Sequence, residues 1–133
     1  MKVFKRAFIA IGLVLAVHIV LVATGAYEIN HIDTPMHVAG GFVIAMLGLA
    51  IHHAVASAHH TAFAPMWYHF LFVVGFAMLV GVAWEFYEYV FDQTFAVWFD
   101  IARAQLSLTD TMKDLLMDGL GATTAFAFLR RQL

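Results

Sequence analysis

The 133-residue chain contains no cysteine, and only 12% of its residues are charged. The absence of cysteine excludes disulfide frameworks, thiolate zinc sites, iron–sulfur clusters and cysteine nucleophiles. Soluble domains contain about 25% charged residues, because a small domain must present polar groups to water over much of its surface. With 63% hydrophobic residues, this chain lacks the polar groups for such a surface. It is therefore predicted to be a membrane protein.

Positive charge is also scarce, since seven Lys and Arg residues stand against nine Asp and Glu residues. A basic stripe that binds phosphates is excluded, so we expect no nucleic-acid partner. A helix that spans a bilayer needs about 20 apolar residues, and a chain of this length holds at most four or five such spans. We therefore expect a single transmembrane domain whose partner is the lipid bilayer.

Four apolar segments stand out, at about residues 7–26, 36–51, 66–91 and 111–129. Each is predicted to be a helix, because backbone polar groups find no water partner in hydrocarbon. The first segment has the basic start of a signal peptide, but its length exceeds the usual apolar stretch of about 7–15 residues. It is predicted to be an uncleaved span. The expected fold is an all-α, integral membrane four-helix bundle.

Basic residues predict the orientation of the bundle. Five of the seven lie near the two ends of the chain, namely Lys2, Lys5, Arg6, Arg130 and Arg131. Cytoplasmic segments of membrane proteins carry an excess of Lys and Arg. With four spans, both termini are therefore predicted to be cytoplasmic, and the connections at 27–35 and 92–110 face outward.

The longer outward connection contains apolar residues at helical spacing, namely Phe95, Trp98, Phe99, Ala102 and Leu106. This pattern predicts a short amphipathic helix in the outer headgroup layer, between the third and fourth spans. An aromatic-belt loop is the alternative. Asp92 and Asp100 are expected to be solvated residues of this interface.

Acidic residues gather on one face at the outer ends of three spans. Spacings of three and four residues place the members of each set on one helix face, and Gly41, Gly81 and Gly121 continue these faces. Small residues mark the places where membrane helices approach closely, so the acidic groups are predicted to point into the bundle. The sets are Asp33 with His37 in the second span, Glu85, Glu88 and Asp92 in the third, and Asp110, Asp114 and Asp118 in the fourth.

Such a cluster requires a counter-charge, because a charged side chain at the bilayer centre costs about 2.5–3.5 kcal/mol or more. Only Lys113 and Arg103 lie near enough in sequence to neutralise it. A divalent metal is the simplest remaining cation, and carboxylates with one imidazole suit Mg, Mn, Fe or Zn. The candidate metal ligands are Asp33, His37, Glu85, Glu88, Asp114 and Asp118.

Helix capping is the competing explanation for two of these residues. Asp33 precedes Thr34 and Pro35 at a favourable helix start, and Asp110 is placed to cap the fourth span. For both, capping and a functional role stay open. Capping does not explain the carboxylates that lie one to three turns inside their helices, namely Glu85, Asp114 and Asp118.

Two imidazole pairs, His52-His53 and His59-His60, are expected in the connection at 52–65. They have the composition to bind a transition metal, although an ordinary polar loop is the simpler interpretation. His18 and His69 lie on apolar faces and are expected to be hydrogen-bonded core residues.

The acidic motifs together resemble a known family. Asp33-x-x-x-His37, Trp84-Glu85-x-x-Glu88 and Asp110-Thr111-x-x-Asp114-x-x-x-Asp118 resemble VanZ-like small membrane proteins, over about residues 30–125. The closest variant is the YjdF-like group of bacterial inner-membrane proteins. The resemblance implies a bacterial inner-membrane location and, for VanZ-like proteins, an association with reduced susceptibility to glycopeptide antibiotics.

The chain departs from the VanZ-like pattern at two positions. Those proteins often have Gln and Asn where this chain has Glu88 and Asp118. The more anionic set favours one metal or two and puts the antibiotic-resistance role in doubt.

The leading hypothesis is a metal site at the extracytoplasmic face of the membrane. If the protein is an enzyme, we expect metal-dependent hydrolysis or transfer on lipid or envelope-precursor head groups, with a lipid-linked small molecule as substrate. The metal would lower the pKa of a bound water towards about 7. Glu88 and Asp110 are the candidate catalytic residues, Glu88 as general base and Asp110 as a ligand or a neighbour of one.

Two alternatives belong to other classes. The first is a cation-binding or transport module, with a homo-oligomer as one arrangement. Transport is disfavoured because the inner halves of the spans offer few polar residues, namely His18, His69, Thr123 and Thr124. The second is a structural partner subunit whose carboxylates cap helices.

Overall fold

Four long helices account for most of the chain in the computed structural model, which describes residues 2–29, 31–59, 65–100 and 103–130. They are α1 (Lys2–Ala23), α2 (Asp33–His59), α3 (Met66–Phe91) and α5 (Leu108–Leu129). Shorter elements are η1 (Ala26–Glu28), η2 (Asp92–Ala96) and α4 (Val97–Phe99). These ranges contain no strand, so the all-α prediction is confirmed. His60, Ala102 and Arg131, named in the predictions above, lie outside the described residues.

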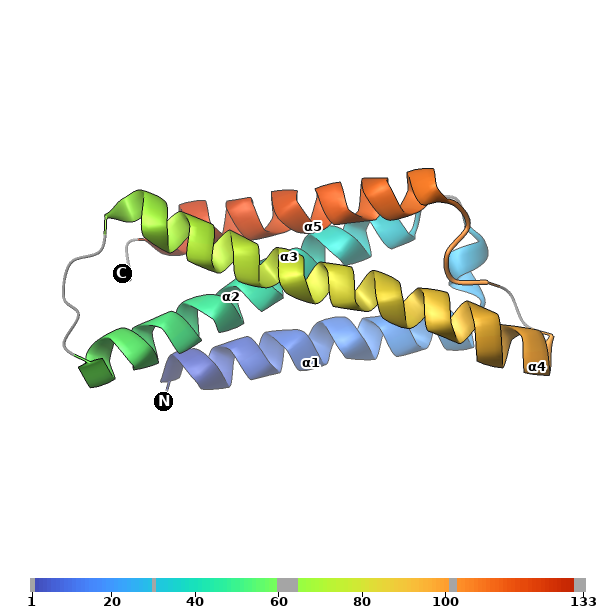
Figure 1. The fold of residues 1–133 in the computed structure, drawn as a ribbon. Helices are drawn as coiled ribbons and strands as arrows, with labels where there is room; N and C mark the ends of the chain where they lie inside the picture. Colours follow the sequence, from blue (N-terminus) through green and yellow to red (C-terminus); the bar gives the residue numbers. More distant parts are fainter. Residues whose placement is uncertain (1, 30, 60–64, 101–102, 131–133) are drawn as a thin grey trace.

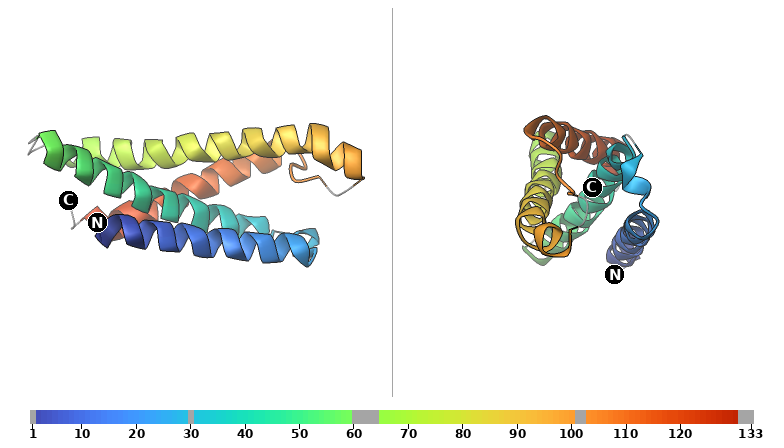
Figure 2. Two further views of the ribbon diagram at one scale, coloured as in Figure 1. Left: turned by 90° about the horizontal axis from the view of Figure 1, so that it is seen from below. Right: turned by 90° about the vertical axis from the view of Figure 1, so that its right-hand side faces the viewer.

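The long helices run side by side, and both ends of the chain lie at the same end of the bundle (Figure 1). The opposite end contains the beginnings of α2 and α5 and the end of α3. Helix α2 contacts all three other long helices, whereas α1 packs mainly against α2. Viewed along the bundle, α2, α3 and α5 enclose the interior and α1 lies to one side (Figure 2).

The closest approach in the bundle is between α2 and α5. A Cβ atom added to Gly41 would overlap the backbone carbonyl of Asp118, and one added to Gly121 would overlap that of Val38. Both positions therefore require glycine, as small residues do where membrane helices meet backbone to backbone. The glycines that the sequence placed on the acidic faces thus lie in the contact between helices.

The apolar core occupies the half of the bundle nearer the chain termini. It consists of small and medium side chains from three helices, namely Ala45, Leu49, Val73, Ala77, Ala122, Ala125 and Phe126. The half at the other end has polar groups in its interior instead. Sequence spacing alone accounts for this division, because the acidic residues lie near one end of each helix and the alanines near the other.

Large apolar side chains cover the outside of the bundle, as expected for helices that face lipid. Only Ala7 is buried on α1, and its Leu13 and Ile19 are 63% and 65% exposed. Within the described residues, three helices are long and apolar enough to cross a membrane, at Lys2–Ala23, Asp33–Ala58 and Met66–Phe99. Helix α5 is not among them; it carries the acidic residues of the fourth predicted span together with Lys113.

The helical segment after α3 differs in detail from the predicted interfacial helix. It continues directly from α3 through the π-helical η2 to α4 and ends at Asp100, whose φ is 52°. Phe95 stacks on Phe91 and Phe99, with ring centroids 5.9 and 6.3 Å apart, and is half exposed. Leu106, which the spacing placed on the same face, follows outside the helix.

Candidate functional site

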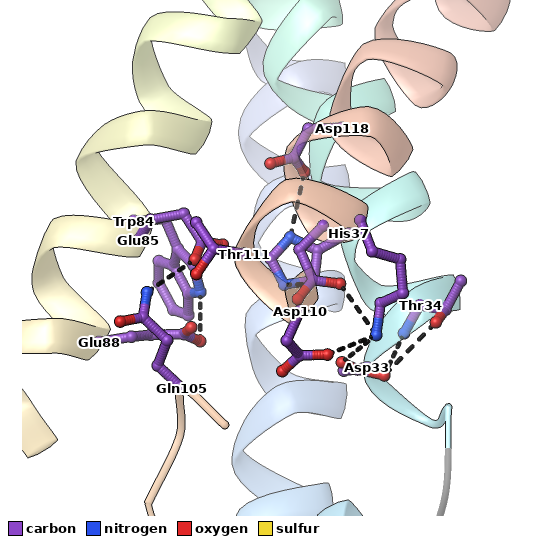
Figure 3. Close-up of polar contacts among 12 residues, drawn as sticks. Asp33, Thr34, His37, Trp84, Glu85, Glu88, Gln105, Asp110, Thr111 and Asp118 are labelled. Carbon is purple, nitrogen blue, oxygen red and sulfur yellow. Dashed lines mark hydrogen bonds and ion pairs between the residues drawn. The ribbon is translucent and has the colours of Figure 1, made fainter. Parts of the chain in front are cut away.

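Polar side chains from α2, α3 and α5 converge at the end of the bundle opposite the chain termini, here called the acidic end (Figure 3). The spacing within each helix explains this convergence, since each set occupies one face and that face points inward. The residues come from the first turns of α2, the last turns of α3 and the first three turns of α5. They are Asp33, His37, Glu85, Glu88, Asp110, Asp114 and Asp118.

The imidazole of His37 lies between two carboxylates of α5. Its Nδ1 is 3.4 Å from Asp118 Oδ1, and its Nε2 is 4.0 Å from Asp114 Oδ1. Glu85 approaches from α3. Each of His37, Glu85 and Asp114 offers one ligand atom, and these three atoms lie within 4.8 Å of one another. These three residues, here called the His37 group, come from three different helices and have the separation of ligands around one cation.

Three carboxylate oxygens at this position lack a hydrogen-bond partner among the described residues: Glu85 Oε1, Asp114 Oδ1 and Asp118 Oδ2. The three residues are only 4–6% exposed. Buried polar atoms are nearly always hydrogen-bonded, and an unpaired buried carboxylate is costly. The arrangement therefore calls for a cation, a proton or ordered water beside these oxygens.

Asp118 is buried because glycines leave room for it. A Cβ atom on Gly81 of α3 would lie 2.5 Å from Asp118 Oδ2, and one on Gly40 of α2 would lie 3.9 Å from Oδ1. The carboxylate thus occupies space where α2, α3 and α5 meet. A larger residue at position 81 has to displace it.

A second set of carboxylates lies beside the first. One ligand atom each from Asp33, Asp110 and Asp114 lie within 4.8 Å of one another, and these residues are here called the Asp33 group. Lys113 Nζ is 3.0 Å from Asp33 Oδ2, 2.7 Å from Asp110 Oδ1 and 3.5 Å from Asp114 Oδ1. Asp114 is shared by both groups.

The two capping alternatives have different outcomes. Asp33 is the first residue of α2, and its Oδ1 accepts the backbone N–H of Thr34 at 2.8 Å, while Oδ2 faces Lys113. Asp33 therefore serves the helix start and the ion pair together. The proposed cap at Asp110 is wrong, because α5 begins at Leu108 and Ser107 accepts the backbone N–H of Asp110.

Glu88 lies apart from both groups and belongs to a network that reaches α1. Trp84 Nε1 donates to Glu88 Oε1 at 2.8 Å, and the Trp84 ring packs edge-on against His18. His18 Nδ1 lies 2.5 Å from the hydroxyl of Tyr27 in η1. Burial, followed by the charges of Glu88 and Asp33, raises the pKa of Tyr27 to about 12, so this hydroxyl is neutral at physiological pH.

At the acidic end, one sequence prediction was wrong and one residue was missed. Asp92 is 3% exposed rather than solvated, because its carboxylate accepts the backbone N–H groups of Ala104 and Gln105, at 2.7 and 2.9 Å. Gln105 Nε2 then donates to Glu85 Oε2 at 3.1 Å. Helical spacing placed Asp92 on the face of Glu85 and Glu88, but it did not predict that Asp92 is buried. Gln105 lies outside the helices, where spacing gives no signal.

The histidines at the opposite end are placed differently from the prediction. His52 and His53 lie inside α2 and not in a connecting loop. His52 is 8% exposed, and its Nε2 lies 2.7 Å from Nδ1 of His69 in α3. His69 is thus a hydrogen-bonded residue between helices, as expected.

The apolar exterior and helical architecture define the chain as an all-α membrane protein whose polar groups are concentrated at one end of the bundle. The model of a family described as predicted membrane protein (DUF2238) matches residues 5–133, and the chain belongs to this family. Neither a curated protein nor a solved structure matches it. The family match does not specifically support the VanZ-like or YjdF-like groups.

Proposed function

We propose that this membrane protein binds one divalent metal ion at the acidic end, through His37, Glu85 and Asp114. The observation that carries the proposal is the pair of buried oxygens Glu85 Oε1 and Asp114 Oδ1 beside the His37 ring, neither of which has a hydrogen-bond partner among the described residues. A metal ion bound there would satisfy both oxygens and offset their charge. Carboxylates combined with one imidazole suit Mg, Mn, Fe or Zn.

Asp118 is assigned the role of orienting His37. With its Nδ1 3.4 Å from Asp118 Oδ1, His37 is placed to donate Nδ1–H to that carboxylate and keep Nε2 for the metal. Metal-ligating histidines commonly donate their other ring N–H to a carboxylate in this way. The sequence instead predicted that Asp118 is itself a metal ligand. The metal affinities of Asp118→Asn and Glu85→Gln distinguish the two roles.

Three protein ligands leave a coordination position for water, which is the arrangement of catalytic zinc sites. This supports the more specific proposal of metal-dependent hydrolysis or transfer on lipid or envelope-precursor head groups, with Glu88 as general base. The positive-inside rule puts the acidic end on the extracytoplasmic side, with both termini cytoplasmic. The VanZ-like and YjdF-like motif resemblance supports the bacterial inner membrane as the location.

Charge at the acidic end favours a second candidate function, cation binding without chemistry. Seven carboxylates lie at the acidic end, and three of them pair with Lys113, the one Lys or Arg side chain that forms an ion pair there in the described part of the chain. Even with a divalent metal bound, this excess of formal negative charge disfavours an anionic head group. Transport is not favoured, because the half of the bundle beyond the site is filled by the apolar core.

The test is elemental analysis of the purified protein in detergent, after dialysis against each candidate metal. We expect close to one ion per chain, with a large loss of affinity in Glu85→Gln and in Asp114→Asn. Glu28→Gln is the matched control, because Glu28 is an exposed acidic residue of η1 near the same end. A wild-type protein without stoichiometric metal would overturn the proposal. Unchanged binding in both site variants would do so as well.

A further inference from the structure

We propose that the acidic end has a second cation position, formed by the Asp33 group and occupied by the ammonium group of Lys113. A hard divalent cation, such as Mg²⁺ or Ca²⁺, binds there when an uncharged residue replaces Lys113. The inference rests on the proposed function only in that Asp114 belongs to both groups.

The ammonium group lies where a metal ion would lie. Lys113 Nζ is within 3.5 Å of one oxygen from each of Asp33, Asp110 and Asp114. Those three residues offer ligand atoms within 4.8 Å of one another, which is the spacing of donors around a single cation. The lysine side chain thus brings a positive charge to the centre of a three-carboxylate site.

Asp114 supplies an independent indication that this position takes a ligand. Its side chain is 5% exposed, and its Oδ1 has no hydrogen-bond partner in the described ranges. That oxygen faces Lys113 Nζ at 3.5 Å, which is beyond good hydrogen-bond distance. The ammonium group of Lys113 therefore offsets the charge of Asp114 but leaves Oδ1 without a hydrogen bond.

The donor set indicates which cations fit. The position is built from carboxylate oxygens alone, and such sites suit Mg²⁺, Ca²⁺ and Mn²⁺ rather than softer metals. The His37 group contains an imidazole and has a different preference. The second position is also reachable from water, since the side chains of Lys113 and Asp33 are 28% and 26% exposed.

Removing the ammonium charge leaves three carboxylates close together without a cation. Like charges at such short separations repel strongly, and either an ion or protons must replace the lysine. In the wild-type chain Lys113 therefore prevents a second metal ion from binding at the acidic end. It also holds the first turn of α2 against the first turn of α5.

The test compares Lys113→Met, which keeps the side-chain length without the charge, with Lys113→Arg, which keeps the charge. Metal content and calorimetric titration are measured with Mg²⁺ and with Ca²⁺ at millimolar concentration. We expect Lys113→Met to bind one ion more per chain than the wild type, and Lys113→Arg to equal the wild type. Adding Asp110→Asn to Lys113→Met is expected to weaken the extra ion at least tenfold.

Each outcome separates this inference from the proposed function. Two ions in Lys113→Met against one in the wild type support both. One ion in Lys113→Met against none in the wild type overturns the proposed function and keeps the second position. Equal numbers in the two proteins overturn the second position.

If a variant folds poorly, thermal unfolding tests whether it binds the second ion. The second position predicts that Mg²⁺ or Ca²⁺ raises the Tm of Lys113→Met more than that of the wild type, and that Asp110→Asn removes the difference. A Tm that responds equally to the ions in both proteins overturns the inference.

Discussion

Asp118 illustrates how one residue can be interpreted in two ways. The sequence placed it with the metal ligands, because it continues the face of Asp110 and Asp114. The structure puts its Oδ1 beside Nδ1 of His37, whereas the other members of the His37 group are Glu85 and Asp114. Spacing predicts which residues share a face, but the order of contacts along that face depends on how three helices meet.

The first prediction distinguishes these roles by comparing Asp118→Asn with Glu85→Gln. Loss of a residue that orients a ligand typically lowers metal affinity about 10–100-fold. We therefore expect Asp118→Asn to bind the same number of ions at reduced affinity, and Glu85→Gln to lose more. Competitive titration with a metal-sensitive dye measures both. An Asp118→Asn loss as large as that of Glu85→Gln would indicate that Asp118 is itself a ligand.

The second prediction concerns Trp84, which the sequence analysis named only as part of the Trp84-Glu85-x-x-Glu88 motif. Its Nε1 donates to Glu88 at 2.8 Å. Trp84→Phe keeps an aromatic ring against His18 and removes the donor, so we expect a loss of about 1.5–3 kcal/mol in the free energy of unfolding, as for hydrogen bonds to charged groups. The control is Trp67→Phe, since Trp67 is 63% exposed at the opposite end. Equal stability of the two variants would contradict this assignment.

Among the elements, the third prediction tests the contact between α2 and α5. Gly121→Ala places a methyl group against the backbone carbonyl of Val38, so the helices must separate. We expect a loss of about 1–3 kcal/mol in the free energy of unfolding, as for other overpacked sites. We also expect weaker metal binding. Gly75→Ala is the control, because nothing lies within 4 Å of its added Cβ. Chemical unfolding in detergent compares the two. A Gly121→Ala variant as stable as the control would contradict the close packing.

The fourth prediction concerns the segment Arg103–Ser107, which Asp92 attaches to the bundle. Asp92→Ala removes the acceptor for the backbone N–H groups of Ala104 and Gln105. Hydrogen exchange of those two amides is expected to become faster, because both lose the carboxylate that accepts their N–H groups. Asp100→Ala is the control, since Asp100 is exposed at the end of α4. Unchanged exchange in Asp92→Ala would show that the segment is held by other contacts.

The bounds of a helix were predicted well where one continuous apolar pattern defined them. The third span was expected at 66–91 and α3 runs from Met66 to Phe91, because its apolar run is continuous. The fourth span was expected from 111, but α5 starts at Leu108. Ser107 and Asp110 are both good capping residues, and the sequence does not decide between two caps one turn apart.

The segment between α3 and α5 was predicted less well for a physical reason. Helical spacing puts Phe95, Trp98 and Phe99 on one face. It does not show which groups contact Asp92. The π-helical turn at Asp92–Ala96 buries Asp92 and Ala96, and Asp92 is then bonded by a segment that is not helical. Contacts between an irregular segment and a helix leave no periodic trace in a sequence.

For the whole molecule, the fifth prediction concerns orientation in the membrane. The chain has no cysteine, so single introduced cysteines report which side they face. Glu28→Cys is expected to react with a membrane-impermeant maleimide added outside intact cells, whereas Arg130→Cys is expected to react only after the membrane is permeabilised. The reason is the excess of basic residues at both termini. The reverse pattern would place the acidic end in the cytoplasm.

The division of the bundle into an apolar half and a polar half is what the sequence predicted best. A low fraction of charged residues indicated a membrane protein, and the positions of the acidic residues indicated one end of it. The sequence did not reveal the separation of that end into two groups around His37 and Lys113, because this depends on distances between helices. The central claim is that the first group holds a metal through one imidazole and two carboxylates.

Pulsed electron paramagnetic resonance of the Mn²⁺-loaded protein tests this claim most directly, since it detects a nitrogen bound to the ion. We expect a directly coordinated imidazole nitrogen in the wild-type protein and in His52→Gln, whose altered residue lies at the opposite end. We expect this signal to be absent in His37→Gln. A bound manganese ion without a coordinated nitrogen, or a nitrogen signal that persists in His37→Gln, would contradict the account.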